Sequence, residues 1–233
     1  MPDVHDKVIS QIKPDWLKIR IQGGEQYAET AKIVRDNGLH TICSSGMCPN
    51  RAECWSRRTA TFMILGDVCT RGCKFCATAT GRTLPTDKEE PSRVARSVSL
   101  MGLRHAVITS VTRDDLTDGG AAHWAEVVKA VSAQNPETTI ELLIPDMWGD
   151  ASLVDIITAS GPDIVGHNIE TVRRLTPQVR SRAEYDVSLR TIANIAGGGM
   201  VAKSGIMVGM GETSDEVLET LDDLRKTGCQ IVT

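Results

Sequence analysis

The sequence contains no apolar run that approaches the roughly 18 residues required by a membrane-spanning helix. Its first ten residues include Asp3, Asp6 and Lys7 and lack the apolar core of a signal peptide. Positive charge is not in excess either, since the formal net charge is −4. A strongly basic surface is the electrostatic footprint of nucleic-acid-binding proteins, so the composition argues against that class. These absences predict a cytoplasmic protein that binds neither nucleic acid nor membrane.

Cysteines that divide naturally into disulfide pairs are also absent. Of the seven cysteines, three lie between residues 43 and 54, three lie between residues 69 and 76, and Cys229 stands alone. In a reducing compartment, clustered cysteines bind metals or take part in catalysis more often than they form disulfides. The two triplets therefore indicate metal sites, whereas Cys229 is expected to be a buried thiol.

A glycine-rich dinucleotide fingerprint is missing after the first apolar strand. Beyond residue 60, short apolar runs alternate with amphipathic segments, which is typical of βα units around a parallel sheet. Strands are expected over 61–66, 105–109, 139–144, 163–169, 203–208 and 229–233, and helices over 91–101, 121–134, 151–159, 187–196 and 215–226. We therefore predict an α/β fold, namely a partial (β/α)6 TIM-like barrel. An open doubly wound sheet is the alternative.

The first 60 residues are predicted to be an N-terminal extension, and residues 61–233 are predicted to form the barrel. Within the extension, residues 25–37 have helical spacing and Gly38 is a suitable stop signal. Residues 41–55 contain three cysteines with Gly46 and Pro49, which indicates an irregular cluster-binding loop. The chain ends at Thr233 inside an apolar run, so we expect that a C-terminal segment of the barrel is missing.

The second cysteine triplet, Cys69-Thr-Arg-Gly-Cys73-Lys-Phe-Cys76, follows the first strand directly. In parallel barrels the chemistry lies on loops at the C-terminal ends of the strands, so this position suits an active site. Thiolates are soft ligands that select zinc, copper(I) or iron–sulfur clusters. A structural zinc site needs four ligands, whereas three thiolates on a four-iron cluster leave one iron free for another ligand. A zinc site and ordinary core cysteines are the alternatives.

The Cys-x3-Cys-x2-Cys spacing, with Phe75 before the last cysteine, resembles that of the radical S-adenosylmethionine enzymes. This resemblance implies that Cys69, Cys73 and Cys76 bind a [4Fe–4S] cluster. It also implies that the open iron binds the amino and carboxylate groups of S-adenosylmethionine, the cosubstrate. Reductive cleavage of the cosubstrate then releases a 5′-deoxyadenosyl radical.

A more specific resemblance extends over the chain from Lys13 to Thr233. The first triplet has the spacing Cys-x4-Cys-x5-Cys, which is weak evidence by itself, but its surroundings resemble those of the lipoyl synthases. The matching stretches are Asn37-Gly-Leu-His-Thr-Ile-Cys43, Cys48-Pro-Asn-Arg-Ala-Glu-Cys54-Trp55, Ala60-Thr-Phe-Met-Ile-Leu-Gly66, Asp114-Asp115-Leu-Thr-Asp-Gly-Gly120, His167-Asn-Ile-Glu-Thr171 and Ser204-Gly-Ile-Met-Val-Gly-Met-Gly-Glu212.

The resemblance implies the reaction and its partners. Lipoyl synthases insert two sulfur atoms, at C6 and C8, into an octanoyl chain attached to a lysine of a lipoyl carrier protein. Cys43, Cys48 and Cys54 are then expected to bind a second, auxiliary [4Fe–4S] cluster, which donates the sulfur. The implied partners are octanoylated domains of 2-oxoacid dehydrogenase E2 subunits, the glycine cleavage H protein and a low-potential electron donor. In this family a serine of a C-terminal Arg-Ser-Ser-Tyr stretch completes the auxiliary cluster, and this sequence contains no such stretch.

Residues at the ends of two expected strands are candidates for binding the cosubstrate. By resemblance to related radical enzymes, Asn168 and Glu170 face the ribose hydroxyls. Thr109 and Ser110 end the second expected strand, where the methionine part of the cosubstrate would lie. The alternative is that Asn168 caps a turn, Glu170 starts a helix, and Ser110 bonds to loop backbone. His167 is expected to be a strand-end histidine with its hydrogen bonds satisfied. Arg180 and Arg182 are candidate partners of the cosubstrate carboxylate, but solvated side chains are the default expectation.

Basic residues are locally in excess around the two triplets. Between residues 51 and 82 there are six basic and two acidic side chains in an otherwise acidic chain. This basic patch either guides an acidic carrier domain to the site or balances the charge of the thiolate-ligated clusters. Its basic members are Arg51, Arg57, Arg58, Arg71, Lys74 and Arg82.

Two other functions are compatible with parts of the pattern. A biotin-synthase-like enzyme would use the same radical chemistry on a free small molecule, but the compact first triplet upstream of the radical motif argues against it. An electron carrier or a zinc-stabilised binding module would not need the long βα array. Production of 5′-deoxyadenosine distinguishes the enzymes from such a carrier.

Overall fold

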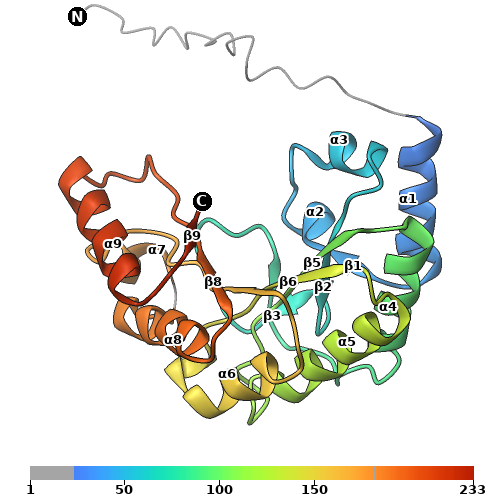
Figure 1. Cartoon of the computed structure of the whole chain (residues 1–233). Helices are drawn as coiled ribbons and strands as arrows, with labels where there is room; N and C mark the ends of the chain where they lie inside the picture. Colours follow the sequence, from blue (N-terminus) through green and yellow to red (C-terminus); the bar gives the residue numbers. More distant parts are fainter. Residues whose placement is uncertain (1–23, 181) are drawn as a thin grey trace, which may run out of the picture.

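The computed structural model describes residues 24–180 and 182–233, and its centre is a curved seven-stranded sheet (Figure 1). The start of the expected extension, together with Lys13, lies outside the described residues. The strands lie side by side in the order β1-β2-β5-β6-β7-β8-β9. Their bounds are β1 His40–Thr41, β2 Thr61–Ile64, β5 His105–Ser110, β6 Thr139–Leu143, β7 Ile164–Gly166, β8 Val201–Ser204 and β9 Ile231–Val232. All neighbouring pairs are parallel except β1 and β2.

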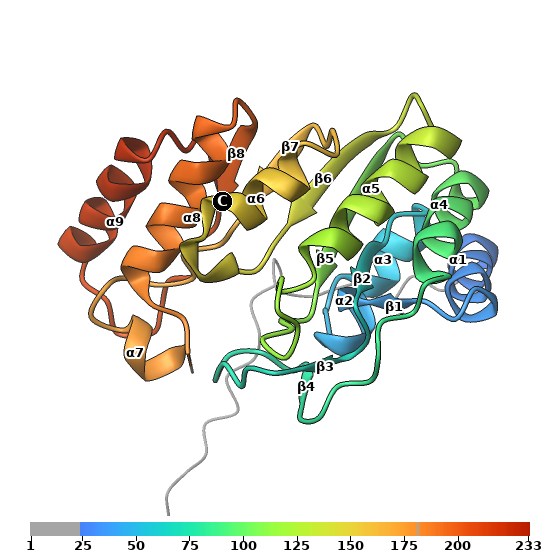
Figure 2. The same cartoon turned by 90° about the horizontal axis from the view of Figure 1, so that it is seen from below.

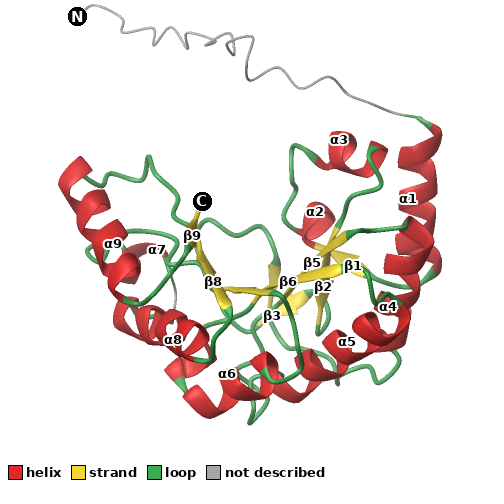
Figure 3. Cartoon of the chain, viewed as in Figure 1, coloured by secondary structure: helices red, strands yellow, loops and turns green. Residues whose placement is uncertain are grey.

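The larger helices cover the convex side of this sheet (Figures 2 and 3). They are α4 Glu90–Met101, α5 Ala121–Gln134, α6 Ala151–Thr158, α8 Tyr185–Gly197 and α9 Ser214–Lys226. From β2 to β9 the spatial order of the strands is their chain order, whereas a doubly wound sheet reverses at a switch point. The doubly wound alternative is therefore wrong. Within the described part of the chain β1 and β9 are the two edges, so the predicted partial barrel with six parallel strands is confirmed.

The two faces of the strands carry different residues, because side chains alternate along a strand. The helix-facing side is apolar and almost fully buried, with Phe62, Ile64, Ile108, Ile140, Leu142 and Val165. Burying each such side chain contributes roughly 1.5–3 kcal/mol. The alternate residues line a cavity on the concave side, and they are Thr61, Met63, Thr109 and Leu143. The hydrophobic core thus lies between the sheet and the helices, and the inner face is available for a functional site.

Helices α4 and α5 have clear local determinants. Pro91 lies in the first turn of α4, where its missing N–H has no intrahelical partner to lose. Gly102 ends α4 in the left-handed conformation at φ 62°, which glycine adopts without strain. In α5, Val128 and Val131 are fully buried, and the helix packs against α4. The predicted bounds of both helices are confirmed to within one residue.

Several parts of the chain differ from the prediction. Residues 41–55 are not irregular throughout, since they contain α2 Ile42–Ser45 and the start of α3 Arg51–Ser56. Thr41 begins α2 because its hydroxyl accepts a hydrogen bond from the Ser44 N–H at 3.3 Å. β7 ends three residues earlier than predicted, and β8 spans 201–204 rather than 203–208. Beyond β8 the positive φ angles of Gly209 and Gly211 turn the chain back toward α9. The two-stranded β3 Val68–Cys69 and β4 Ala79–Thr80 and the short α7 Thr176–Val179 were not predicted.

The described part of the extension is built onto the edge of the barrel. β1 pairs with β2, and α1 Glu25–Asp36 packs against α3 and α4. Cys229, expected to be buried, is half-buried, and this burial raises the pKa of its thiol. Among the described residues no helix combines the length and the apolar character needed to cross a bilayer.

Candidate cluster and cosubstrate site

A cavity of 370 Å³ opens at the C-terminal ends of the parallel strands. Its wall contains all three cysteines of the second triplet, together with Ile42 and Gly46 on either side of Cys43. Both cysteine loops therefore reach the same cavity. The wall also contains the predicted cosubstrate residues Ser110, Asn168 and Glu170, and in addition Arg71, Asp146, His167 and Arg180.

The second triplet lies on a loop that begins at the end of β3. The Sγ atom of Cys69 accepts hydrogen bonds from the backbone N–H groups of Arg71 and Thr112, both at 3.4 Å. These two bonds fix the position of the Cys69 sulfur relative to the loop and to the end of β5. The N–H of Cys76 donates to the carbonyl of Cys73 at 3.1 Å, which folds this end of the loop into a turn. The donor set thus consists of three thiols at one wall of the cavity.

The first triplet is arranged around the two short helices of the extension. Cys43 is buried in α2, Cys54 lies in α3, and Cys48 lies between these helices. The Cys48 N–H donates to the Cys43 carbonyl at 3.1 Å, which draws the loop together. Burial raises the pKa of the Cys54 thiol, and the negative charges of Cys43 and Cys48 raise it further. The three cysteines therefore lie in one short segment made of two helices and the turn that joins them.

These thiols suit clusters better than single ions. In residues 24–180 and 182–233, no group of three or more His, Cys, Asp or Glu side chains lies close enough to hold one metal ion. A four-iron cluster places its thiolate ligands further apart than a single ion does, and it is ligated by cysteine. Each triplet supplies three soft ligands of the required chemistry, so both fit a [4Fe–4S] cluster with one iron left for a further ligand.

Ser110, the last residue of β5, has an unusual side chain. Its Oγ atom is buried and has no hydrogen-bond partner among the described residues. The preceding Thr109 differs, because its hydroxyl donates to the Leu143 carbonyl at 3.0 Å. A buried hydroxyl without a partner is costly, so its presence in a cavity wall points to a missing ligand. The alternative that Ser110 bonds to loop backbone is not what the structure has.

Asn168 and Glu170 follow β7 and lie near each other. Burial raises the pKa of Glu170, while the charge of Arg180 and a hydrogen bond from Asn168 oppose that shift. The backbone of Glu170 is left-handed at φ 66°, which is uncommon for a residue with a side chain and is typical of functional sites. No helix starts there, since the next helix begins at Thr176, so that part of the alternative is wrong.

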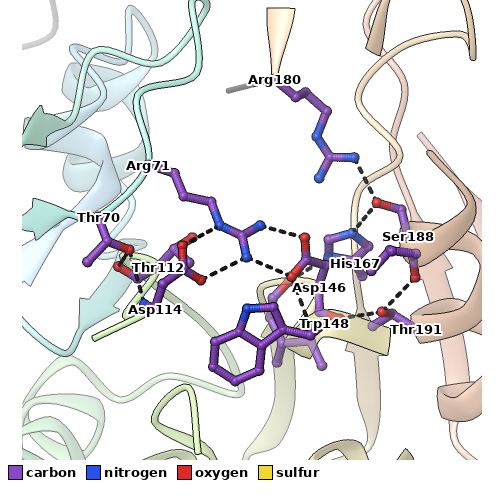
Figure 4. Close-up of polar contacts among 12 residues, drawn as sticks. Thr70, Arg71, Thr112, Asp114, Asp146, Trp148, His167, Arg180, Ser188 and Thr191 are labelled. Atoms are coloured by element: carbon purple, nitrogen blue, oxygen red, sulfur yellow. Dashed lines mark hydrogen bonds and ion pairs between the residues drawn. The ribbon is translucent and has the colours of Figure 1, made fainter. Parts of the chain in front are cut away.

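His167 and Arg180 are joined through Ser188 (Figure 4). Nδ1 of His167 lies 2.9 Å from the Ile144 carbonyl, to which it donates, and Nε2 lies 3.0 Å from the Ser188 hydroxyl. Burial lowers the pKa of His167 to about 4, so the ring is neutral and, as predicted, satisfied. Nη1 of Arg180 donates to Ser188 Oγ at 2.8 Å. Arg180 is buried, so the expectation of a solvated side chain is wrong.

The basic patch is not a uniform surface. Arg71 is buried between Asp114 and Asp146. Arg57 pairs with Glu53 at 2.8 Å, and Arg58 pairs with Glu29 at 2.7 Å, so two further charges are already balanced. The nearby loop aspartates are likewise engaged: Asp115 accepts from Arg113, and Asp118 accepts from the N–H groups at the start of α5. No sequence signal distinguished Arg71 and Arg180 from solvated arginines, because their burial depends on loops distant in the chain.

Comparisons with known proteins show the family to which the chain belongs. The sequence profile of the Radical SAM superfamily matches residues 63–224. Relatives named lipoyl synthase include one from Parabacteroides distasonis, 58% identical over 221 residues, and one from Bacteroides fragilis, 59% identical over 221 residues. These alignments cover 95% of this chain and 79% and 77% of the respective relatives.

Solved structures with a similar fold are more distant in sequence. Methylornithine synthase superposes with a TM-score of 0.60 at 14% identity, over 87% of this chain and 62% of that chain. Streptococcus suis SuiB bound to S-adenosylmethionine superposes with a TM-score of 0.58 at 13% identity, over 88% of this chain and 49% of that chain. At these identities the likeness concerns the fold alone.

Proposed function

The chain belongs to the lipoyl synthases of the radical SAM superfamily, and on that premise we propose how its residues serve the reaction. Lipoyl synthases are sulfurtransferases that use two [4Fe–4S] clusters and S-adenosylmethionine. They insert sulfur at C6 and C8 of an octanoyl chain carried by a lipoyl carrier protein. The relatives named lipoyl synthase align over 95% of this chain, which argues against an electron carrier, a zinc-stabilised module and a biotin-synthase-like enzyme.

Cys69, Cys73 and Cys76 hold the cluster that binds the cosubstrate, and Cys43, Cys48 and Cys54 hold the auxiliary cluster. The observation that carries this assignment is that both cysteine loops border one cavity of 370 Å³. When bound, the cluster on Cys69, Cys73 and Cys76 supplies an electron for cleavage of the cosubstrate, and the auxiliary cluster supplies sulfur. The chain keeps both groups beside the same space, so the carbon to be modified needs to move little between them.

Ser110, Asn168 and Glu170 bind the cosubstrate. The unpartnered Ser110 hydroxyl is free to bond a polar group of its methionine part. Asn168 and Glu170 lie across the cavity at the end of β7 and are suited to accept hydrogen bonds from the ribose hydroxyls. Arg180, which borders the same space, places a positive charge where a carboxylate is to be held. Its bond to Ser188 fixes the direction of the guanidinium.

The apolar wall of the cavity serves the acyl chain. Met63, Phe75, Leu143 and Ile144 line it, and Phe75 is 39% exposed at its edge. Unactivated carbon–hydrogen bonds do not respond to acid or base catalysis, so the protein contributes by positioning the chain and excluding water. These residues are suited to both tasks because they offer no competing polar group.

The finer partners follow from the same premise. The octanoyl substrates are carried by the E2 subunits of 2-oxoacid dehydrogenases and by the H protein of glycine cleavage, and a low-potential donor supplies electrons. Residues 1–60 act as the extension that presents the auxiliary cluster, and residues 61–233 act as the radical SAM barrel. None of the seven cysteines forms a disulfide, which suits a reducing compartment.

Anaerobic reconstitution with iron and sulfide tests the assignment. The unmodified chain is expected to bind about eight irons, and each triple cysteine-to-alanine variant about four. Release of 5′-deoxyadenosine is expected to survive in the Cys43/Cys48/Cys54→Ala variant and to disappear in the Cys69/Cys73/Cys76→Ala variant. Cys229→Ala is the matched control and should lose no iron. Equal iron content in all four proteins would contradict the assignment.

A further inference from the structure

The guanidinium of Arg71 lies between two carboxylates (Figure 4). Nε and Nη2 donate to Oδ2 and Oδ1 of Asp114, both at 2.8 Å. Nη1 and Nη2 donate to Oδ2 and Oδ1 of Asp146 at 2.5 and 3.0 Å. Four hydrogen bonds in two paired sets fix the plane and the position of the guanidinium. Only arginine offers such a fork, because a lysine ammonium is a point charge.

This triad is largely buried. The side chains of Arg71, Asp114 and Asp146 are 7%, 14% and 3% exposed. A small cavity of 10 Å³ adjoins all three side chains, and Arg71 and Asp146 also border the 370 Å³ cavity. Removing one member leaves buried charge without compensation, so the three side chains are strongly coupled.

The triad connects the second cysteine loop to two neighbouring strands. Arg71 belongs to the loop, between Cys69 and Cys73, whereas Asp114 follows β5 and Asp146 follows β6. Thr70 adds to the first connection, since its N–H and hydroxyl donate to the Thr112 carbonyl at 3.1 and 3.0 Å. Its hydroxyl also accepts from the Asp114 N–H at 3.1 Å. Arg71 makes the side-chain link from the loop to the end of β6.

Asp146 is held in place by its own surroundings. Its Oδ1 accepts from the Trp148 N–H at 3.1 Å, and its carbonyl accepts from the Thr191 hydroxyl of α8 at 2.5 Å. The next three residues, Met147, Trp148 and Gly149, all have positive φ, at 42°, 53° and 69°. Two consecutive non-glycine residues in this region are strained, so the turn is maintained by its contacts. The turn directs the Asp146 carboxylate toward Arg71.

We propose that Arg71, Asp114 and Asp146 form a clamp that holds residues 69–76 in their metal-binding shape before the cluster arrives. This inference rests on the proposed assignment of Cys69, Cys73 and Cys76 as ligands. The three are positioning residues, because they act through the loop rather than on the cosubstrate. Groups that orient ligands in this way typically change metal affinity by about 10- to 100-fold when they are altered.

A buried ion pair that merely stabilises the fold is the competing explanation, and Arg113 provides the matched control. Its side chain is 3% exposed and lies in the same β5–α5 connection as Asp114. It bonds Asp115 through two nitrogens at 2.9 and 2.8 Å, and it donates to the Leu65 and Leu84 carbonyls. Arg113→Lys therefore removes a comparable paired contact without touching the cysteine loop.

The test compares Arg71→Lys and Arg113→Lys in the full chain by hydrogen exchange and by iron retention. In the metal-free proteins, exchange across residues 70–76 is expected to accelerate in Arg71→Lys only. After reconstitution, Arg71→Lys is expected to lose iron to a chelator about 10- to 100-fold faster than Arg113→Lys at equal loss of thermal stability. The change that S-adenosylmethionine causes in the electron paramagnetic resonance spectrum should also weaken in Arg71→Lys alone.

If the unmodified chain binds iron as expected, equal hydrogen exchange and equal iron loss in the two lysine variants would overturn the clamp. The ligand assignment would then remain intact. An unmodified chain that loads no iron would instead overturn the ligand assignment, on which the clamp depends. Asp146→Asn gives a further check, since it preserves the shape of the side chain. It should reproduce the faster exchange of residues 70–76, and unchanged exchange in that variant would contradict the role of the β6 connection.

Discussion

Replacing Gly205 by alanine would place a methyl group 2.8 Å from Oδ1 and 3.1 Å from Cγ of Asn168. The 2.8 Å distance is shorter than real contacts of a Cβ atom and the 3.1 Å distance is tighter than most, so the Asn168 side chain must move. The hydroxyl of Thr233 lies a little further away, at 3.2 Å. The backbone of Gly205 is outside the left-handed region, so alanine itself is tolerated by the main chain. The substitution therefore acts directly on Asn168. It also acts on Glu170, because the side chains of Asn168 and Glu170 are hydrogen-bonded to each other.

The expected loss follows from the number of hydrogen bonds involved. Each bond contributes about 0.5–1.5 kcal/mol, so loss of one from Asn168 and one from Glu170 weakens cosubstrate binding by about 1–3 kcal/mol. The dissociation constant of S-adenosylmethionine should then rise roughly 5- to 150-fold. It can be measured by calorimetry on the reconstituted protein. Gly197→Ala is the control, since a Cβ there meets nothing within 4 Å.

A double-mutant cycle determines whether Gly205 acts through Asn168. In an Asn168→Ala background the methyl group at position 205 no longer meets Asn168 and keeps only the 3.2 Å contact with Thr233 Oγ1, so Gly205→Ala should add little to the loss. Fully additive effects would refute the reasoning. The same conclusion would follow if Gly205→Ala and Gly197→Ala bound the cosubstrate equally well.

Three further predictions concern other parts of the site. Ser110→Ala should leave thermal stability unchanged or slightly higher, because an unsatisfied buried hydroxyl is removed, yet weaken cosubstrate binding by about 0.5–1.5 kcal/mol; unchanged affinity would argue against a contact. The folded-state pKa of His167, about 4, lies below its unfolded value near 6.5. Between these two pH values the unfolded chain therefore binds more protons than the folded chain. The free energy of unfolding that is present above pH 6.5 should then fall as the pH approaches 4. His167→Gln should flatten this part of a pH–stability curve. Charge reversal at Lys74 and Arg82 should raise the KM for an octanoylated carrier more than reversal at Arg57 and Arg58, whose charges Glu53 and Glu29 already balance, while cosubstrate cleavage is retained. Equal loss of carrier use and cosubstrate cleavage would argue against docking on the basic patch.

Local sequence patterns predicted the regular framework well. The bounds of α5, 121–134, follow from the spacing of Val127, Val128 and Val131, and those of α4 follow from Pro91 and Gly102. These signals lie within the element that they determine, so no knowledge of the tertiary structure is needed. The βα alternation and the position of the second cysteine triplet after the first strand follow in the same way.

The parts that escaped prediction depend on contacts between distant residues. Arg71 is buried because carboxylates 43 and 75 residues further along the chain converge on it. Arg180 is buried because Ser188 and the Ile169 carbonyl meet it at the cavity wall. The end of β8 depends on pairing with β7 and β9 rather than on its own composition. From the sequence each of these arginines is predicted to be exposed, and only the folded structure shows that both are buried.

The alternation of side chains along the strands has a consequence for the redesign of such a protein. Ile108 and Leu142 lie in the core, whereas their sequence neighbours Thr109 and Leu143 border the cavity. A substitution at one position therefore changes packing in the core, and a substitution at the next changes the wall of the cavity. Met63 combines both roles, because it borders the cavity and is only 2% exposed, so a change made there to reshape the cavity also alters the core.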